Sequence, residues 1–202
     1  MLRKNNHMIT DINQLDLTKK YTYKDYLTWQ FDERVELIRG KVVRMSPAPG
    51  TSHQRASSNL HVAVGSYLRK KPCNIFSAPF DVKLPSLDKS KKEETVVQPD
   101  LSIVCDVSKL DEKGCKGPPD WIIEILSKSS ANKDLTDKYE LYQNAGVKEY
   151  WIVHPAEGTI TPYILSDEGK YELTRNTPFS SGEIITVGIF PDLEIPLAEV
   201  FD

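Results

Sequence analysis

The chain has 202 residues, of which 39% are hydrophobic and 27% charged, with 13 Pro and 10 Gly. This length suits one domain with a single core, and the composition excludes fibrous and disordered classes. No apolar run approaches the roughly 20 residues that span a bilayer, and residues 1–7 lack the apolar core of a signal peptide. We therefore expect a cytoplasmic protein without a membrane partner.

The net charge of −3 is distributed unevenly along the chain. Residues 1–116 carry 20 Lys and Arg against 14 Asp and Glu, a charge of +6, whereas residues 117–202 carry 6 against 15, a charge of −9. The basic portion could hold a polyanion, although such blocks are also common on solvated surfaces. The overall acidity excludes a histone-like coating protein.

The cysteine and histidine spacings support no metal centre of the zinc type. Cys73, Cys105 and Cys115 are odd in number and include no C-x-x-C pair, so we expect thiols rather than a disulfide framework or a thiolate site. His53 and His61 lie eight residues apart, but a zinc site needs three or four ligands and no others converge by spacing. Any metal must therefore be held by oxygen or imidazole.

Periodicity and turn residues predict helices alternating with strands after a polar arm over residues 1–20. Thr22 is the candidate N-cap of the first helix, and Gly146 suits the left-handed cap that ends the last one. In chain order we expect a helix over 21–29, a hairpin over 34–45, a helix over 53–70, strands over 74–84, 95–105 and 121–126, a helix over 133–145, and strands over 149–154, 159–165, 171–174 and 183–187.

This order predicts an α/β (α+β) fold in one domain over residues 21–202. A mixed β-sheet flanked by helices is expected, with parallel pairing of the strand beyond each long helix and extra antiparallel strands at the C-terminus. Residues 121–126 are apolar on both alternating faces, which is typical of a buried central strand. The aromatic tail over residues 162–202 either extends the sheet and core or forms a dimer surface.

Two acids lie where burial makes a carboxylate costly. Asp100 follows Gln98 and Pro99 in an apolar strand, and Glu124 interrupts the buried run over 121–126. A carboxylate there loses several kcal/mol of solvation unless a cation or hydrogen-bond donors replace water. A positive group should therefore face each of these acids.

Lys138 is the candidate for that positive group. At roughly 100° per residue it falls within the apolar arc of its helix, between Leu135, Leu141 and Tyr142, rather than on the polar face. A lysine directed at the core needs a partner, unless its stem packs while its head reaches water. Because this helix follows the strand of Glu124, it can pack back on the sheet near the carboxylates.

Two carboxylates and a lysine at a sheet edge are the parts needed to cleave a phosphodiester with Mg²⁺. Hard oxygen ligands hold the metal, and an ammonium stabilises charge at the phosphate. The chain contains no G-x-x-x-x-G-K-[ST], G-x-G-x-x-G or G-x-S-x-G motif, which disfavours nucleotide hydrolysis, dinucleotide redox and α/β-hydrolase chemistry.

An ordered set of motifs resembles the Uma-type family of restriction endonucleases, a branch of the PD-(D/E)xK nuclease superfamily. The set begins at the hairpin and runs through the last long helix to the strand over 149–153. Its members are Val35–Gly40, Met45-Ser46-Pro47, His53, Gln98-Pro99-Asp100, Ile123–Ser127, Asp134, Lys138, Tyr142, Ala145–Val147 and Glu149–Val153. Lys128 and His154 depart from the family pattern.

The resemblance implies a restriction-endonuclease-like fold in which Asp100 and Glu124 bind Mg²⁺ or Mn²⁺. The superfamily lysine usually stands two residues after the glutamate, where this chain has Leu126, and it corresponds here to Lys138. Glu36 would be a further catalytic acid, or else a solvent-facing residue of the hairpin.

Two more residues have supporting roles in this interpretation. His53 could cap its helix or contact phosphate, and Gln98 belongs to the motif that ends in Asp100. The expected protein is thus a Mg²⁺-dependent DNA endonuclease, and we expect a homodimer because cleavage of a duplex often needs two sites. Arg39, Lys41 and Arg44 of the hairpin, together with residues 69–71 and 89–92, are expected to flank Asp100.

Two alternatives remain at this point. A catalytically silent nuclease-fold homodimer could bind nucleic acid or act as a scaffold, and an enzyme with the same residues could act on RNA or on another phosphate ester.

Overall fold

The computed structural model describes residues 8–45, 50–86, 93–127 and 133–202, with the backbone alone for residues 133–135. Its helices are η1 (Ile12–Gln14), α1 (Tyr23–Tyr26), α2 (Thr51–Leu68), η2 (Val107–Lys109), α3 (Lys133–Ala145) and α4 (Ala198–Phe201). Its strands are β1 (Val35–Ile38), β2 (Lys41–Arg44), β3 (Asn74–Ser77), β4 (Asp81–Leu84), β5 (Thr95–Val97), β6 (Leu101–Val104), β7 (Leu110–Asp111), β8 (Gly114–Lys116), β9 (Trp121–Ile125), β10 (Glu149–His154), β11 (Thr159–Leu165), β12 (Tyr171–Leu173), β13 (Phe179–Ser180), β14 (Ile184–Thr186) and β15 (Glu194–Pro196).

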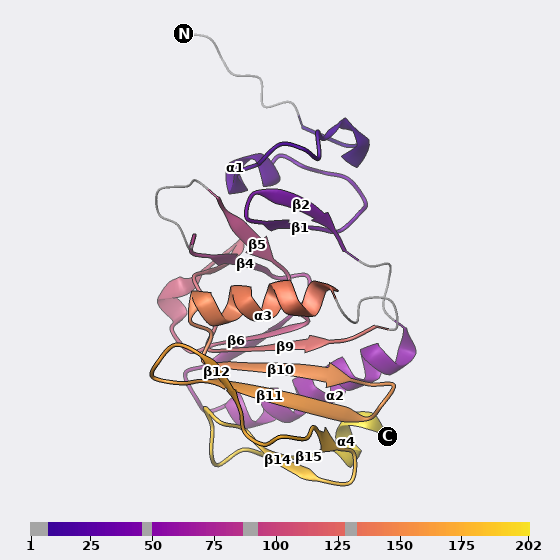
Figure 1. Ribbon diagram of the computed structural model, residues 1–202, viewed down its shortest axis with the longest axis vertical. Helices are drawn as coiled ribbons and strands as arrows, with labels where there is room; N and C mark the ends of the chain where they lie inside the picture. Colours follow the sequence, from indigo (N-terminus) through magenta and orange to yellow (C-terminus); the bar gives the residue numbers. More distant parts are fainter. Residues whose placement is uncertain (1–7, 46–49, 87–92, 128–132) are drawn as a thin grey trace.

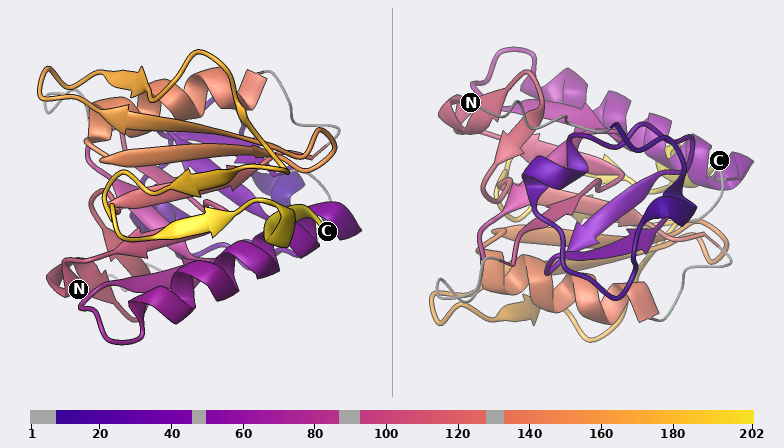
Figure 2. Two further views of the ribbon diagram at one scale, coloured as in Figure 1. Left: turned by 90° about the horizontal axis from the view of Figure 1, so that it is seen from below. Right: turned by 90° about the horizontal axis from the view of Figure 1, so that it is seen from above.

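The strands form two large sheets, so the α/β (α+β) class is confirmed and the single mixed sheet is in fact divided (Figure 1). The seven-stranded sheet has the order β12-β11-β10-β9-β6-β3, with β13 beside β11. The six-stranded sheet has the order β2-β1-β5-β4-β8-β7, and β14 and β15 pair separately. Figure 2 shows the seven-stranded sheet lying between α2 on one face and α3 on the other.

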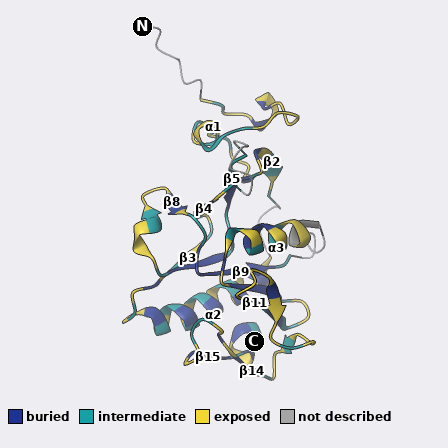
Figure 3. Cartoon of the chain, turned by 60° about the vertical axis from the view of Figure 1, so that its left-hand side comes forward, coloured by how far each residue is buried: buried dark blue, intermediate teal, exposed yellow. Residues whose placement is uncertain are grey.

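The two faces of this sheet bury separate apolar clusters. On the α2 side, Leu60 and Val64 pack with Trp121 and Ile123. On the α3 side, Leu141 packs with residues of β9 and β10 in a second cluster. All five residues of β9 are buried, which Figure 3 shows as dark blue at the centre of the fold, so the predicted central strand is confirmed.

Two segments that the sequence presents as single strands each pass from one sheet to the other. The first divides into β3 and β4 around Pro79, and the second divides into β5 and β6 around Pro99. Proline donates no ladder hydrogen bond, so both prolines lie where pairing stops. The residues beside Pro99 therefore stand at the junction of the two sheets.

The predicted hairpin is confirmed as β1 and β2, joined by Arg39 and Gly40 with φ of 51° and 80°. Left-handed conformation at both turn residues matches the twist of paired strands, and Gly40 adopts it without a Cβ penalty. Ile12 and Leu15, from the predicted arm, are buried against Val35 of this hairpin. The boundary between arm and domain stays a prediction.

Of the two strands that follow the long helices, only one pairs in the expected parallel direction. The strand after α3 confirms the prediction, because β10 runs parallel to β9. The strand after α2 contradicts it, because β3 pairs antiparallel with β6. The C-terminal strands are antiparallel as predicted, and Ile185 and Ile195 from β14 and β15 are buried in the core on the α2 side. That tail extends the sheet and core, and a dimer surface stays a prediction.

The cysteine prediction is wrong for two of the three residues. Cys73 and Cys105 form a disulfide with a Cα–Cα distance of 3.8 Å. They flank the facing pair Asn74 and Val104 of β3 and β6, and this register brings them together. Cys115 is a free, buried thiol, as expected for packing. In the part of the chain that is described, no helix is both long and apolar enough to cross a membrane.

Candidate active site

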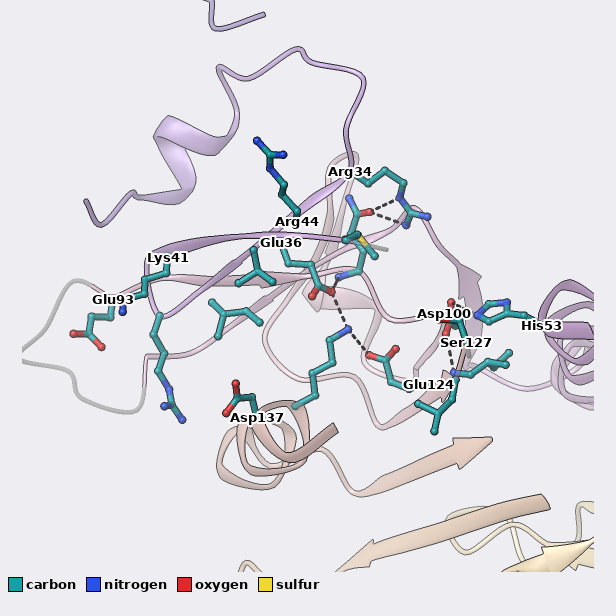
Figure 4. A pocket seen from close by; sticks show the side chains of 18 of the residues that line it. Arg34, Glu36, Lys41, Arg44, His53, Glu93, Asp100, Glu124, Ser127 and Asp137 are labelled. Atoms are coloured by element: carbon teal, nitrogen blue, oxygen red, sulfur yellow. Dashed lines mark hydrogen bonds and ion pairs between the residues drawn. The ribbon is translucent and has the colours of Figure 1, made fainter. Parts of the chain in front are cut away.

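Glu36, Asp100, Glu124 and Lys138 all line one cavity of about 460 Å³ at the junction of the two sheets (Figure 4). They come from β1, the turn before β6, β9 and α3, respectively. Four residues separated by as many as 102 positions in the sequence therefore meet in one place. The geometry brings together every residue that the sequence predicts as catalytic.

Glu36 connects the hairpin to the rest of the site. Its side chain is 4% exposed, and its Oε1 accepts hydrogen bonds from Lys138 Nζ at 3.0 Å and from the Gln98 amide at 2.9 Å. The solvent-facing alternative for Glu36 is therefore excluded. Gln98, predicted as a supporting residue, fixes Glu36 through its backbone rather than through its side chain.

Glu124 is held between a cation and a phenol on the α3 face of the sheet. Its Oε1 accepts hydrogen bonds from Lys138 Nζ at 2.9 Å and from the Tyr142 hydroxyl at 2.6 Å. Burial raises the pKa of this carboxyl to about 7, against the lowering effect of the Lys138 ammonium. Burial and the Glu124 carboxylate raise the pKa of Tyr142 well above its ordinary value, so the phenol stays a proton donor.

Lys138 points into the protein, as its position on the helix predicts. Its side chain is 12% exposed and its ammonium lies between Glu36 and Glu124, which excludes the alternative in which it reaches solvent. Burial lowers the pKa of this lysine, but the two carboxylates outweigh burial and raise it above the ordinary value. Lys138 is therefore a permanent cation near neutral pH and cannot serve as a general base.

Asp100 lies beside Glu124 because β6 and β9 are neighbours and Leu101 faces Ile123. Asp100 Oδ2 accepts a hydrogen bond from the Ile125 amide at 2.7 Å, and Oδ1 lies 3.3 Å from His53 Nε2. Burial lowers the pKa of His53, but the Asp100 carboxylate more than compensates and raises it. His53, in the first turn of α2, thus contacts the predicted metal ligand and does not cap its own helix through a side-chain bond.

Basic side chains surround the mouth of the cavity. Arg39, Lys41 and Arg44 of the hairpin line it, as predicted, together with Lys20 and Arg34. Glu93 and Asp137 also line it, so the lining carries both signs of charge. The basic side chains that line the cavity form a potential contact surface for a polyanion.

The prediction that residues 69–71 flank Asp100 is wrong. They lie at the far end of α2, where Arg69 follows His53 by a helical distance of about 24 Å. Lys71 instead pairs with Asp192 at 3.0 Å. Residues 89–92 and Lys128 lie outside the described residues.

The donor set fits Mg²⁺ better than zinc. Within the described residues no group of three or more His, Cys, Asp and Glu side chains gathers as a metal cluster. Mg²⁺ commonly binds through one or two carboxylates and completes its shell with water and substrate phosphate, and the pair Asp100 and Glu124 fits that requirement. His61 bonds to Ser77 Oγ at 2.8 Å and does not share a partner with His53.

Two residues at the site were not predicted from the sequence. Arg34 lies at the cavity mouth, and its Nη2 donates a hydrogen bond to Gln98 Oε1 at 2.9 Å. The sequence indicates only a core and motif residue at Tyr142, whereas its hydroxyl donates a hydrogen bond to Glu124. Tyr142 stands four residues after Lys138, so the two side chains lie next to each other on one face of the helix. This spacing is the sequence signal that could have placed the Tyr142 hydroxyl at the site.

Comparisons with known proteins agree with this geometry. A family model named Uma2 and described as "Putative restriction endonuclease" matches residues 23–198. The chain belongs to the Uma2 family. A crystal structure titled as a putative nuclease belonging to DUF820, from Anabaena variabilis, superposes with a TM-score of 0.67 at 18% identity. That match covers 89% of this chain and 97% of the other, and it supports the nuclease-like fold. No curated protein matches the sequence.

Proposed function

We propose that this Uma2 family protein is a Mg²⁺-dependent endonuclease that hydrolyses phosphodiester bonds in DNA. The observation that carries the proposal is the convergence of Asp100, Glu124 and Lys138 in one cavity whose mouth is basic. Carboxylate oxygens suit a hard cation, and fixed positive groups suit a reacting phosphate. Burying charged groups costs free energy of desolvation whatever their role, so a buried cluster with this charge pattern supports a functional role.

Asp100 and Glu124 are the proposed ligands, and Mg²⁺ or Mn²⁺ bound there would polarise the phosphate and lower the pKa of water. Asp100 is oriented by the Ile125 amide and Glu124 by the Tyr142 hydroxyl. Both carboxylates are therefore preorganised, which is the condition for tight geometric control of a reacting group.

Lys138 and Glu36 act next to these ligands. The Lys138 ammonium remains protonated, so its role is to orient the attacking water and to stabilise charge that develops on the phosphate oxygens. Glu36 fixes that ammonium at 3.0 Å and keeps it directed at the cavity. His53 orients Asp100 from the side of α2.

The direct test is nicking of supercoiled plasmid DNA by the purified protein with Mg²⁺ or Mn²⁺. Asp100→Ala should abolish nicking, whereas Asp167→Ala, an exposed aspartate in the turn after β11, should retain it. Equal activity of the Asp100→Ala variant and the control would refute the assignment of the site.

Parallel measurements separate the remaining alternatives. A silent nuclease-fold protein would bind nucleic acid without binding Mg²⁺ in calorimetry, and a panel of DNA, RNA and small phosphodiesters under one metal identifies the substrate class. We also propose a cytoplasmic homodimer; analytical ultracentrifugation of the purified chain tests the oligomeric state, and fractionation of cells that express it tests the location.

A further inference from the structure

A second hollow, of about 390 Å³, lies beside the cavity of the candidate active site. One wall is the start of α2, with Gln54, Ser57, Ser58 and His61, and the other is the end of β3 at Ser77. The hydrogen bond of 2.8 Å between His61 Nδ1 and Ser77 Oγ ties these walls together. This hollow is therefore a built feature of the junction between α2 and the sheet.

The two hollows adjoin each other at three residues of the proposed reaction centre. Arg34, His53 and Asp100 line both of them. Figure 4 shows His53 next to Asp100 and Arg34 above them, each with a marked contact. A chain-like ligand whose reacting bond lies at Asp100 would thus extend into both hollows.

The linings differ in chemistry. The mouth of the first cavity carries Lys20, Arg39, Lys41 and Arg44, whereas Arg34 is the one arginine or lysine among the described residues of the second. The second lining consists chiefly of hydroxyl, amide and imidazole groups beside small apolar side chains. Neutral hydrogen-bonding groups of this kind suit a sugar and a base edge better than a run of phosphates.

Two residues that line both hollows have hydrogen-bonding capacity that their contacts within the described residues do not use up. The Arg34 guanidinium bonds to Gln98 Oε1 through Nε at 3.3 Å and Nη2 at 2.9 Å, and a guanidinium has five N–H donors. His53 is 8% exposed, and among the described residues its Nδ1 has no hydrogen-bond partner. A buried polar atom without a partner is costly, and a bound group can satisfy it.

We propose that the second hollow is a nucleotide subsite. It takes the sugar and base on one side of the reacting phosphodiester, while the cations at the mouth of the first cavity hold the strand on the other side. The proposal rests on the proposed function, because that function places the reacting phosphate at Asp100. The volume lies at the lower end of the range for small-molecule pockets, which suits one nucleotide unit.

The test is a matched pair of charge insertions on α2. Ser58 lines the second hollow, and Ser66, an exposed serine two turns further along the helix, does not. Affinity for a short fluorescein-labelled DNA duplex is measured by anisotropy in EDTA, so the readout does not require hydrolysis. Ser58→Glu should weaken binding by about tenfold because it places a negative charge in the hollow that the polyanionic strand would enter, and Ser66→Glu should stay within about twofold of the unaltered protein.

Ser58→Lys provides the opposite sign and should bind as tightly as the unaltered protein or more tightly. Equal affinities for Ser58→Glu and Ser66→Glu would overturn the subsite while leaving the proposed function intact if plasmid is still nicked. Selective weakening by Ser58→Glu, in a protein that nicks no plasmid with either metal, would support nucleotide binding in the second hollow but refute both the proposed function and a reacting phosphodiester at Asp100. Absence of DNA binding by the unaltered protein would overturn the subsite as well.

Discussion

Replacing Lys138 with methionine removes the cation that two buried carboxylates share. Lys138 Nζ lies 3.0 Å from Glu36 Oε1 and 2.9 Å from Glu124 Oε1, and none of the three side chains is more than 12% exposed. Methionine has a similar length but cannot donate a hydrogen bond or carry charge. The variant therefore keeps much of the packing and isolates the electrostatic contribution.

The expected loss is large because a buried charge is left without its partner. Removing one member of a buried ion pair typically costs about 3–5 kcal/mol of unfolding free energy. Glu36 retains the Gln98 amide and Glu124 retains the Tyr142 hydroxyl, so each keeps one donor. We expect Lys138→Met to lose about 3–5 kcal/mol near pH 7.

Urea denaturation of the variant and of a matched surface control measures this loss. Lys116 pairs with Asp111 at 2.7 Å, but its side chain is 67% exposed, so Lys116→Met should cost less than about 1 kcal/mol. Equal losses in the two variants would refute the buried counterion role of Lys138. The comparison needs no assumption about catalysis.

The pH dependence gives a second check on the same reasoning. Burial already raises the pKa of Glu124 above its unfolded value, and loss of Lys138 should raise it further. Ionisation of such a group destabilises the folded state, and protonation removes that penalty. The stability difference between Lys138→Met and the unaltered protein should therefore shrink from about pH 7 to about pH 5. A difference that stays constant would contradict this account.

Three further predictions address other parts of the site and fold. Tyr142→Phe removes a hydrogen-bond donor to Glu124, so the pKa of the Glu124 carboxyl should rise. The acid limb of the pH profile of plasmid nicking should then move to higher pH, and an acid limb that does not move would contradict the role of the Tyr142 hydroxyl. Cys115 is buried, burial raises its pKa to about 11, and the other two cysteines form a disulfide. A thiol reagent near neutral pH should therefore find no fast-reacting thiol in the native protein. It should find one thiol after denaturation, and three after denaturation with reduction. Combined Lys41→Gln and Arg44→Gln should lower the log–log salt slope of DNA affinity by about 2, whereas an unchanged slope removes these cations from the interface.

Periodicity predicted the two long helices, α2 and α3, and the direction of Lys138, because the spacing of apolar residues along a helix shows which face it buries. Leu60 and Val64 of α2 are fully buried, as their spacing indicates. The same reasoning applied to α3 identified a lysine within an apolar arc, and its ammonium lies between two acids. Local sequence sufficed there because no distant partner had to be known.

Pairing between strands could not be predicted in the same way. Pro79 and Pro99 mark interruptions in the sequence, but they do not say that the chain passes from one sheet to another. The disulfide between Cys73 and Cys105 depends on the β3–β6 register, which an odd cysteine count does not reveal. Burial of Glu36 likewise depends on the pairing of β1 with β5, two strands that are distant in the chain.

The position of the lysine explains why the two sheets and the proposed chemistry depend on one another. In a strand, residues 124 and 126 share a face, so the usual superfamily position would place a lysine next to Glu124 within one sheet. Here Leu126 packs against the apolar cluster beneath α3, and Lys138 approaches Glu124 from that helix. From α3 the ammonium also reaches Glu36 of the other sheet. A lysine two residues after Glu124 would need no contact with the other sheet to lie next to that glutamate. The group proposed to act on the phosphate is thus also the ionic link between the hairpin and the central sheet, so its replacement should reduce stability and activity together.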